Sequence, residues 1–122
     1  MKRLALAIVL GVAVAIPAAI ALADTENTNS WGCAWQGSTY TSGGTIYGYT
    51  AEDLPYDCSS RVVIIFTYKL NGTCYYGDWE EAYDWVIQRS HSGSGGVSSH
   101  QIYVPGEGYG QWINTSDPWE LC

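Results

Sequence analysis

The sequence predicts an all-β fold: a small, disulfide-stapled antiparallel β-sandwich or barrel of meander or Greek-key type. Short runs rich in Val, Ile, Thr, Tyr and Trp recur along the chain, and turn signals containing Gly or Pro separate them. This series is not the strand–helix alternation of a βαβ fold, and no second domain is visible. The chain has 122 residues and four cysteines. Because so small a domain buries only about two-thirds of its unfolded surface, we expect disulfides to contribute to its stability.

The first 23 residues predict a secretory signal peptide. Met1-Lys2-Arg3 is basic, an uncharged apolar run follows from Leu4 to Ile20, and Ala21-Leu22-Ala23 forms an Ala-x-Ala cleavage site. The alternative is a membrane anchor, which the short run and the processing site disfavour. We therefore expect a secreted, extracellular protein, cleaved after Ala23, with no stable membrane insertion once the signal is removed.

The rest of the chain divides into a disordered mature N-terminus, residues 24–30, and a single β domain, residues 31–122. The N-terminal segment is rich in Asn, Thr and Glu, which favours disorder. After signal removal, Arg61, Lys69 and Arg89 are the only Lys or Arg residues against twelve carboxylates, a net charge of −9. Such a surface repels phosphate backbones, so we expect no nucleic-acid partner.

The first predicted strands are residues 31–40 and 45–50, separated by a Gly-Gly turn. Trp31, Cys33 and Trp35 would share one face, so both tryptophans are expected to pack beside a buried Cys33; a ligand platform is the alternative. The loop from 51 to 60 is acidic, but its carboxylates lack the spacing of a calcium-binding loop. We expect no metal site and no cofactor.

The clearest local prediction is a β-hairpin over residues 58–79. Asn71-Gly72 favours a type I′ turn between two β-rich runs. A two-residue loop pairs Tyr68 with Tyr75 and, further from the turn, Ile64 with Trp79. The expected core face then carries Val62, Ile64, Phe66, Tyr68, Tyr75 and Trp79.

Residues 80–90 are ambiguous between helix and strand. Asp78-x-x-Glu81 could be a capping box, with Ala82 and Val86 at helical spacing. Tyr83, Trp85 and Ile87 instead alternate with polar residues, and we predict a strand. Residues 91–96 are expected to form a flexible connector, followed by a strand over 97–104 and a short strand within 108–114.

The cysteines predict two disulfides. Four cysteines allow three pairings. We favour Cys33–Cys58 with Cys74–Cys122, because neighbours along a β-meander tend to be neighbours in space and the second bond would pin the C-terminus. There is no Cys-x-x-Cys, which disfavours a zinc site.

The cysteine arrangement, with a β-branched strand between the second and third cysteines, is similar to that of the small proteinaceous α-amylase inhibitors of actinomycetes. This resemblance implies the same first-to-second and third-to-fourth pairing, and inhibition of an extracellular hydrolase. The family inhibits through a Trp-Arg-Tyr tripeptide on its first hairpin. This chain has Trp35-Gln36-Gly37 there and a longer segment after Cys74.

Residues able to carry catalysis are few. His91 and His100 have serines nearby, but no Gly-x-Ser-x-Gly elbow is present, and each histidine is expected to be a surface or structural residue. The second catalytic candidate is a carboxylate pair for glycoside hydrolysis near Trp79 and Tyr83. Its members would come from Asp78, Glu80, Glu81 and Asp84. We expect that the protein is not an enzyme; a small hydrolase is the alternative.

The aromatic composition is the strongest functional indication. The chain has ten tyrosines and six tryptophans against one phenylalanine. Tyr and Trp suit half-exposed binding positions, although both also favour strands in general. We predict a monomeric, non-catalytic protein that binds an extracellular protein or a carbohydrate; a hydrolase inhibitor or a structural surface protein are alternatives. Candidate binding residues are Tyr47, Tyr49, Tyr76, Tyr83, Trp85 and Trp112.

Overall fold

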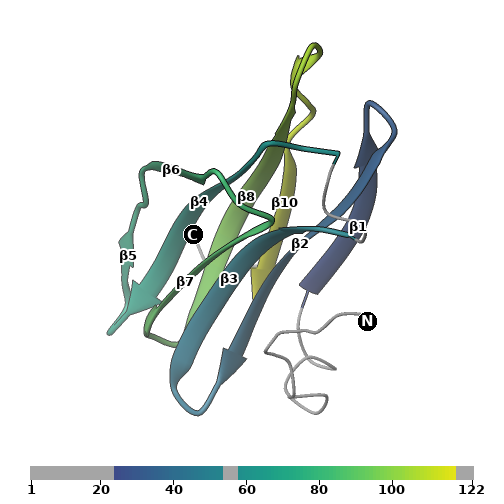
Figure 1. Ribbon diagram of the computed structural model, residues 1–122. Helices are drawn as coiled ribbons and strands as arrows, with labels where there is room; N and C mark the ends of the chain where they lie inside the picture. Colours follow the sequence, from purple (N-terminus) through teal and green to yellow (C-terminus); the bar gives the residue numbers. More distant parts are fainter. Residues whose placement is uncertain (1–23, 54–57, 118–122) are drawn as a thin grey trace.

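The computed structural model describes residues 24–53 and 58–117, and these form an all-β sandwich of two antiparallel sheets (Figure 1). The first sheet has the order β1-β2-β3-β7. Its strands are β1 (Asp24–Ser30), β2 (Cys33–Ser42), β3 (Thr45–Glu52) and β7 (Val86–Ser92). The second sheet has the order β10-β8-β4-β5, with β6 paired to β4 and β9 to β8. Its strands are β4 (Arg61–Leu70), β5 (Thr73–Tyr75), β6 (Trp79–Ala82), β8 (Gly95–Val104), β9 (Gly108–Tyr109) and β10 (Ile113–Asp117).

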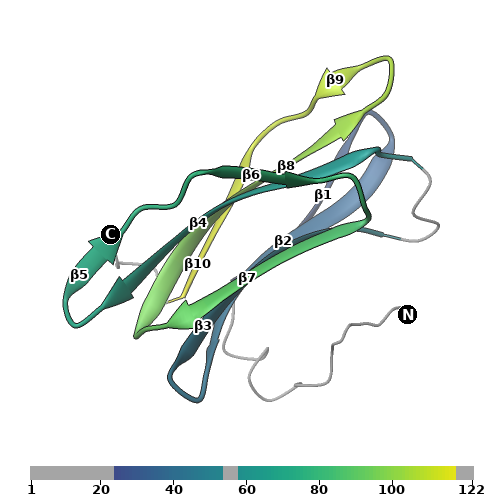
Figure 2. The ribbon, with the colours of Figure 1, turned by 60° about the vertical axis from the view of Figure 1, so that its left-hand side comes forward.

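The chain passes between the two layers three times, at β3–β4, β6–β7 and β7–β8. Figure 2 shows the sheets curling around the space that they enclose. The apolar core lies between them and includes side chains from both layers. Its buried members are Cys33, Trp35, Ile46, Val62, Ile64, Phe66, Ile87, Ile102, Val104 and Ile113. The predicted all-β, disulfide-stapled sandwich is confirmed.

The expectation of a disordered segment at residues 24–30 is wrong. These residues form β1, an edge strand paired with β2 from Asp24↔Thr39 to Ser30↔Cys33. The strand is polar and lacks the apolar alternation that marks a half-buried strand. Backbone pairing and a 2.8 Å bond between the Thr25 and Ser38 hydroxyls hold it in place.

The hairpin is confirmed near its turn and shifted beyond it. Tyr68 pairs with Tyr75 as predicted, but residues 76–78 interrupt the ladder, and Trp79 then pairs with Ile65 rather than Ile64. A shift of one residue moves a side chain to the other face of a sheet. Trp79, expected in the core, is therefore 46% exposed on the outer face.

Of the other residues expected on the core face of the hairpin, some are buried and one is exposed. Val62, Ile64 and Phe66 lie in the core. Tyr75 is exposed at the sheet edge, where its ring stacks on Tyr68 at 5.1 Å between centroids. Gly77 passes so close to the Phe66 backbone that a Cβ would overlap it, which explains a glycine within the interruption.

Residues 80–90 contain no helix, but the predicted strand is divided into two. β6 lies in the second sheet and β7 in the first, with bends at residues 83–85. The predicted connector at 91–96 is also shorter than expected: β7 runs to Ser92 and β8 starts at Gly95. Gly96 has no room for a Cβ, which would lie 2.8 Å from Ile46 and from the Thr67 carbonyl. The glycines here let two layers approach, rather than forming a flexible linker.

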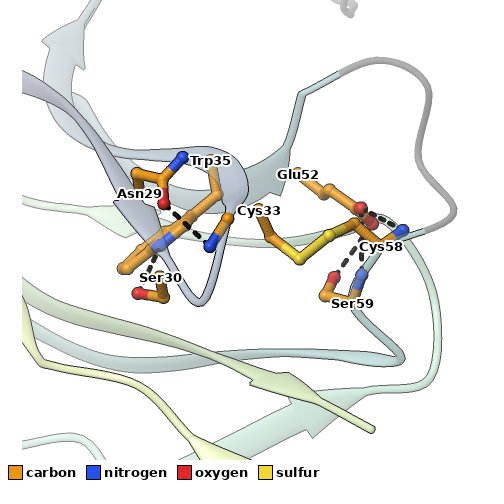
Figure 3. Close-up of a disulfide and its surroundings, with 8 residues drawn as sticks. Asn29, Ser30, Cys33, Trp35, Glu52, Cys58 and Ser59 are labelled. Carbon is orange, nitrogen blue, oxygen red and sulfur yellow. Dashed lines mark hydrogen bonds between the residues drawn. A yellow bond between two sulfur atoms is a disulfide. The ribbon is translucent and has the colours of Figure 1, made fainter. Parts of the chain in front are cut away.

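The Cys33–Cys58 disulfide is present, with 5.6 Å between Cα atoms (Figure 3). It joins β2 to the segment that leads into β4. Cys74 is also disulfide-bonded, while its predicted partner Cys122 lies outside the described residues, as does the predicted signal peptide at 1–23. Among the residues that the structure describes, no helix has the length and apolar character to cross a membrane.

The two tryptophans expected beside Cys33 have different environments. Trp35 is completely buried next to the disulfide, and its indole N–H donates to Ser30 Oγ at 3.0 Å (Figure 3). Trp31 instead lies in the turn between β1 and β2 and is exposed. The first predicted strand therefore begins at Cys33, not at Trp31.

Candidate binding surface

The exposed apolar surface of the described residues is aromatic. All the large hydrophobic side chains that are exposed there are Tyr or Trp. They are Trp31, Tyr75, Tyr76, Trp79, Tyr83, Tyr109 and Trp112. No exposed Leu, Ile, Val, Met or Phe accompanies them among these large side chains, so the surface differs from a core face left uncovered.

Five rings gather on the outer face of the second sheet, and we call this set the aromatic face. Its members are Trp79, Tyr83, Tyr103, Tyr109 and Trp112. The register explains the gathering, because directly opposed residues in antiparallel strands project to the same side. Tyr103 is opposite both Arg61 and Tyr109, while Glu81 is opposite Val63. The inward residues Ile64 and Ile102 alternate with these positions and are fully buried.

Contacts between four of the rings hold them in place, while the fifth, Tyr83, contacts Arg61. Trp79 meets Tyr109 at 5.3 Å between centroids and Trp112 at 5.5 Å, with interplanar angles of 79° and 81°. Tyr103 meets Tyr109 at 4.8 Å and 70°. These are edge-to-face arrangements, in which the positive edge of one ring meets the negative face of another. The aromatic face is therefore preorganised.

Arg61 and Glu81 contact three tyrosines of the aromatic face. The Arg61 guanidinium lies 4.3 Å from the Tyr103 ring centroid and 4.9 Å from that of Tyr83. It donates to the Tyr109 hydroxyl at 3.1 Å, which donates to Glu81 Oε1 at 2.9 Å. Burial, followed by the bond to Glu81, raises the pKa of Tyr109, so the phenol keeps its proton.

Two buried polar atoms belong to Gln101 and Arg61, which flank the aromatic face in the second sheet. Gln101 is 6% exposed, and its side-chain amide donates to the Gly110 carbonyl at 2.8 Å. Gln101 Oε1 and Arg61 Nε are buried and have no hydrogen-bond partner among the described residues. An acceptor and a donor, both unpaired, thus accompany the aromatic rings.

The segment that presents Tyr109 and Trp112 is tied to both sheets. Gly110 N donates to the Ile102 carbonyl at 3.0 Å. Gln111 accepts from Ser30 Oγ at 3.0 Å and donates to Thr28 Oγ1 at 3.1 Å. These bonds connect the β9–β10 segment with the edge strand β1, so its two rings are positioned by the scaffold rather than by a free loop.

The six candidate residues from the sequence are spread over different surfaces. Tyr83 and Trp112 lie in the aromatic face. Tyr47 and Tyr49 are on the outer side of the other sheet, where Tyr47 stacks on Tyr40 at 5.0 Å and the Tyr49 hydroxyl donates to Gln36. Trp85 lies in the bend before β7, and Tyr76 lies between β5 and β6.

The structure adds Trp79, Tyr103, Tyr109 and Arg61 to the site, none of which is among the candidates predicted from the sequence. The hairpin register predicts Trp79 in the core, because the local sequence gives no sign of the interruption at 76–78. Tyr103 could have been found from the alternation of β8, where Ile102 and Val104 point inward on either side of it.

His100 is a structural residue at the centre of the sandwich. It is fully buried, and its Nδ1 and Nε2 lie 2.7 Å from the hydroxyls of Thr50 and Thr115. Because Thr50 donates its own proton to the Val63 carbonyl, Nδ1–H must donate to Thr50 and Nε2 accepts from Thr115. Burial lowers the pKa of His100 to about 3, which keeps the ring neutral. His91 stacks on Tyr68 at 3.9 Å.

Three of the carboxylates considered for catalysis have different hydrogen-bond partners. Glu80 and Glu81 are adjacent in β6 and project to opposite faces. Glu80 bonds Arg89 at 2.6 Å, whereas Glu81 belongs to the aromatic face. Asp84 accepts from the Trp85 N–H at 2.7 Å. Each of these three carboxylates thus has its own partner.

Glu52, one of the carboxylates of the predicted acidic loop, has a structural role. It is 2% exposed, and its carboxylate accepts from the N–H groups of Cys58 and Ser59 and from the Ser59 hydroxyl at 2.8–3.0 Å (Figure 3). The Glu52 carboxylate therefore fixes Cys58 and Ser59 next to the disulfide. No cluster of three metal-ligating side chains occurs in the described residues.

No protein-family model, no curated protein and no solved structure matches this chain. The resemblance to the α-amylase inhibitors implies a contact through the segment that begins at Trp35. Trp35, the first residue of that segment, is completely buried in this fold. Function is therefore inferred from the geometry of the aromatic face itself.

Proposed function

We propose that this chain is a secreted, non-catalytic binding protein that binds a neutral carbohydrate on the aromatic face. The observation that carries the proposal is a set of four Tyr and Trp rings in edge-to-face contact, with the Tyr83 ring against Arg61 and a hydrogen-bonded Arg61–Tyr109–Glu81 group among them. A macromolecule could contact this outer sheet face without entering a deep cleft.

The chemistry of the aromatic face suits a sugar. The C–H groups on one side of a pyranose ring carry partial positive charge, and the π face of Trp or Tyr is negative. Sugar hydroxyls both donate and accept hydrogen bonds, as do the Tyr109 hydroxyl and the Arg61–Glu81 pair around it. The strongly acidic chain would repel an acidic polysaccharide, which favours a neutral one.

Secretion is part of the same proposal. The predicted signal peptide at residues 1–23 would export the chain, and the Cys33–Cys58 disulfide is compatible with an oxidising, extracellular compartment. Extracellular polysaccharides are accessible to a protein in that compartment.

An extracellular protein is the second candidate partner. Trp, Tyr and Arg are the residues most enriched at the energetic centres of protein interfaces, and the aromatic face combines all three. A hydrolase inhibitor would belong to this class. It would bind a protein and show no affinity for isolated glycans.

A matched pair of variants tests the proposal. Tyr83 and Tyr76 are both 74% exposed, but only Tyr83 belongs to the aromatic face. We expect Tyr83→Ala to weaken binding roughly 3- to 10-fold, since one ring contact is worth about 0.5–1.5 kcal/mol. Tyr76→Ala should leave binding unchanged.

Binding is measured by depletion on insoluble cellulose, chitin and starch, and by tryptophan fluorescence with the matching soluble oligosaccharides. Circular dichroism confirms that each variant is folded. Equal losses in both variants would refute the aromatic face as the site. Wild-type protein that binds none of the glycans, but is retained by a secreted protein, would establish the second candidate.

A further inference from the structure

Trp31 occupies a backbone conformation that a large side chain rarely adopts. It has φ 56°, followed by Gly32 with φ 84°. The turn at Asn71-Gly72 has nearly the same geometry, with φ 52° and 81°. Asn and Gly suit these two positions of a type I′ turn, whereas an aromatic residue with positive φ is strained. The same fold therefore contains one favourable and one strained version of this turn.

Packing does not account for the tryptophan. Trp31 is 54% exposed, in contrast to the fully buried Trp35 four residues later. The turn has its own support, because the Gly32 N–H donates to Asn29 Oδ1 at 3.0 Å. A strained residue that the surroundings do not bury is an indication of function.

Trp31 lies beside the aromatic face. Its indole Nε1 is 3.8 Å from the position that a Cβ on Gly110 would occupy. That Cβ would also lie 2.6 Å from Ser30 Oγ, so the absence of a side chain at Gly110 lets the β1–β2 hairpin approach. Gly110 directly follows Tyr109 and stands two residues before Trp112. Figures 1 and 2 both show the β1–β2 turn and β9 at the same end of the molecule.

We infer that Trp31 is a further ligand-binding residue, which extends the aromatic face across the sheet edge onto the β1–β2 hairpin. This inference rests on the proposed carbohydrate-binding function. A surface that continues from the second sheet to a turn of the first would contact successive units of an extended glycan. Trp31 is then needed for long chains and dispensable for short ones.

The test replaces Trp31 with the residue that the other turn uses. Trp31→Asn should raise the midpoint of thermal unfolding, because Asn relieves the strain. It should weaken binding of a neutral hexasaccharide roughly 3- to 10-fold, the effect of losing one ring contact, and leave the affinity for the matching disaccharide unchanged. Calorimetric titration with malto-, cello- and chito-oligosaccharides measures the affinities for the hexasaccharide and the disaccharide.

The reciprocal variant Asn71→Trp is the control for strain. It places a tryptophan in the equivalent turn at a distance from the aromatic face, and should lower the unfolding midpoint without changing glycan affinity. A lower midpoint in Trp31→Asn would make Trp31 a structural residue and overturn the inference. Unchanged hexasaccharide affinity in Trp31→Asn would also overturn it, while loss of binding in Tyr83→Ala would show that the proposed function still holds. If the wild type binds no glycan, the proposed function fails, and the inference fails with it.

Discussion

Acidification should destabilise the fold through His100. The ring is buried between the sheets, and its two nitrogens contact the uncharged hydroxyls of Thr50 and Thr115. Protonation would add a charge with no counter-charge among these partners, and it would remove the acceptor that Thr115 uses. The folded state therefore resists a proton that the unfolded chain takes up readily.

The size of the effect follows from the two pKa values. His100 has a pKa of about 3 in the folded protein, against 6.5 for an ordinary histidine. Above pH 6.5 the ring is neutral in both states, and its contribution is constant. Between pH 6.5 and 3 the unfolded state binds more protons, so the free energy of unfolding falls with decreasing pH. At about 1.36 kcal/mol per pH unit, the loss is on the order of 3 kcal/mol at pH 4.

Two assays measure this loss. Urea unfolding of the wild type at several pH values gives the change in the free energy of unfolding per pH unit. The variant His100→Gln cannot take up a proton at this position, so its free energy of unfolding should depend less on pH over the same range. Because that variant changes the packing as well, the C2 proton of the imidazole is also followed by NMR in the folded protein. An imidazole ring that titrates near pH 6.5 while the protein remains folded would contradict this prediction.

Three further predictions concern stability and the site. Replacing Cys33 and Cys58 together by Ser should lower the free energy of unfolding by about 3 kcal/mol, given their separation of 25 residues, as measured by chemical denaturation. Gly37→Ala should cost about 1–3 kcal/mol in the same assay, because its Cβ would overlap the ring of His100; a stability equal to wild type would contradict this packing. Arg61→Met should weaken glycan binding in calorimetric titrations by removing the guanidinium that contacts three tyrosines of the aromatic face, with the thermal midpoint as its control; unchanged affinity would exclude Arg61 from the site.

The sequence predicted those parts of the fold that local chemistry determines. Asn71-Gly72 specified a turn and, with it, the pairing of Tyr68 with Tyr75. The pairing of Cys33 with Cys58 followed from chain neighbourhood. The interruption at residues 76–78 depends on a close approach of Gly77 to the Phe66 backbone, a contact that no local pattern reveals.

The site was harder to predict because it depends on pairing between distant segments. The aromatic excess indicated an exposed set, and Tyr83 and Trp112 were among its predicted members. Tyr109 joins them only because β9 pairs with the end of β8, and Trp79 only because the register shifts by one residue. The strand β1 was missed for a similar reason: its polar residues are held by a neighbour rather than by burial.

The most direct test of the proposed function is the indole N–H region of the NMR spectrum during titration with a neutral oligosaccharide. We expect the signals of Trp79 and Trp112 to shift together and saturate, while that of the buried Trp35 does not move. Saturating shifts confined to residues around Tyr47 and Tyr49, on the opposite sheet, would contradict it, as would a spectrum that no glycan changes.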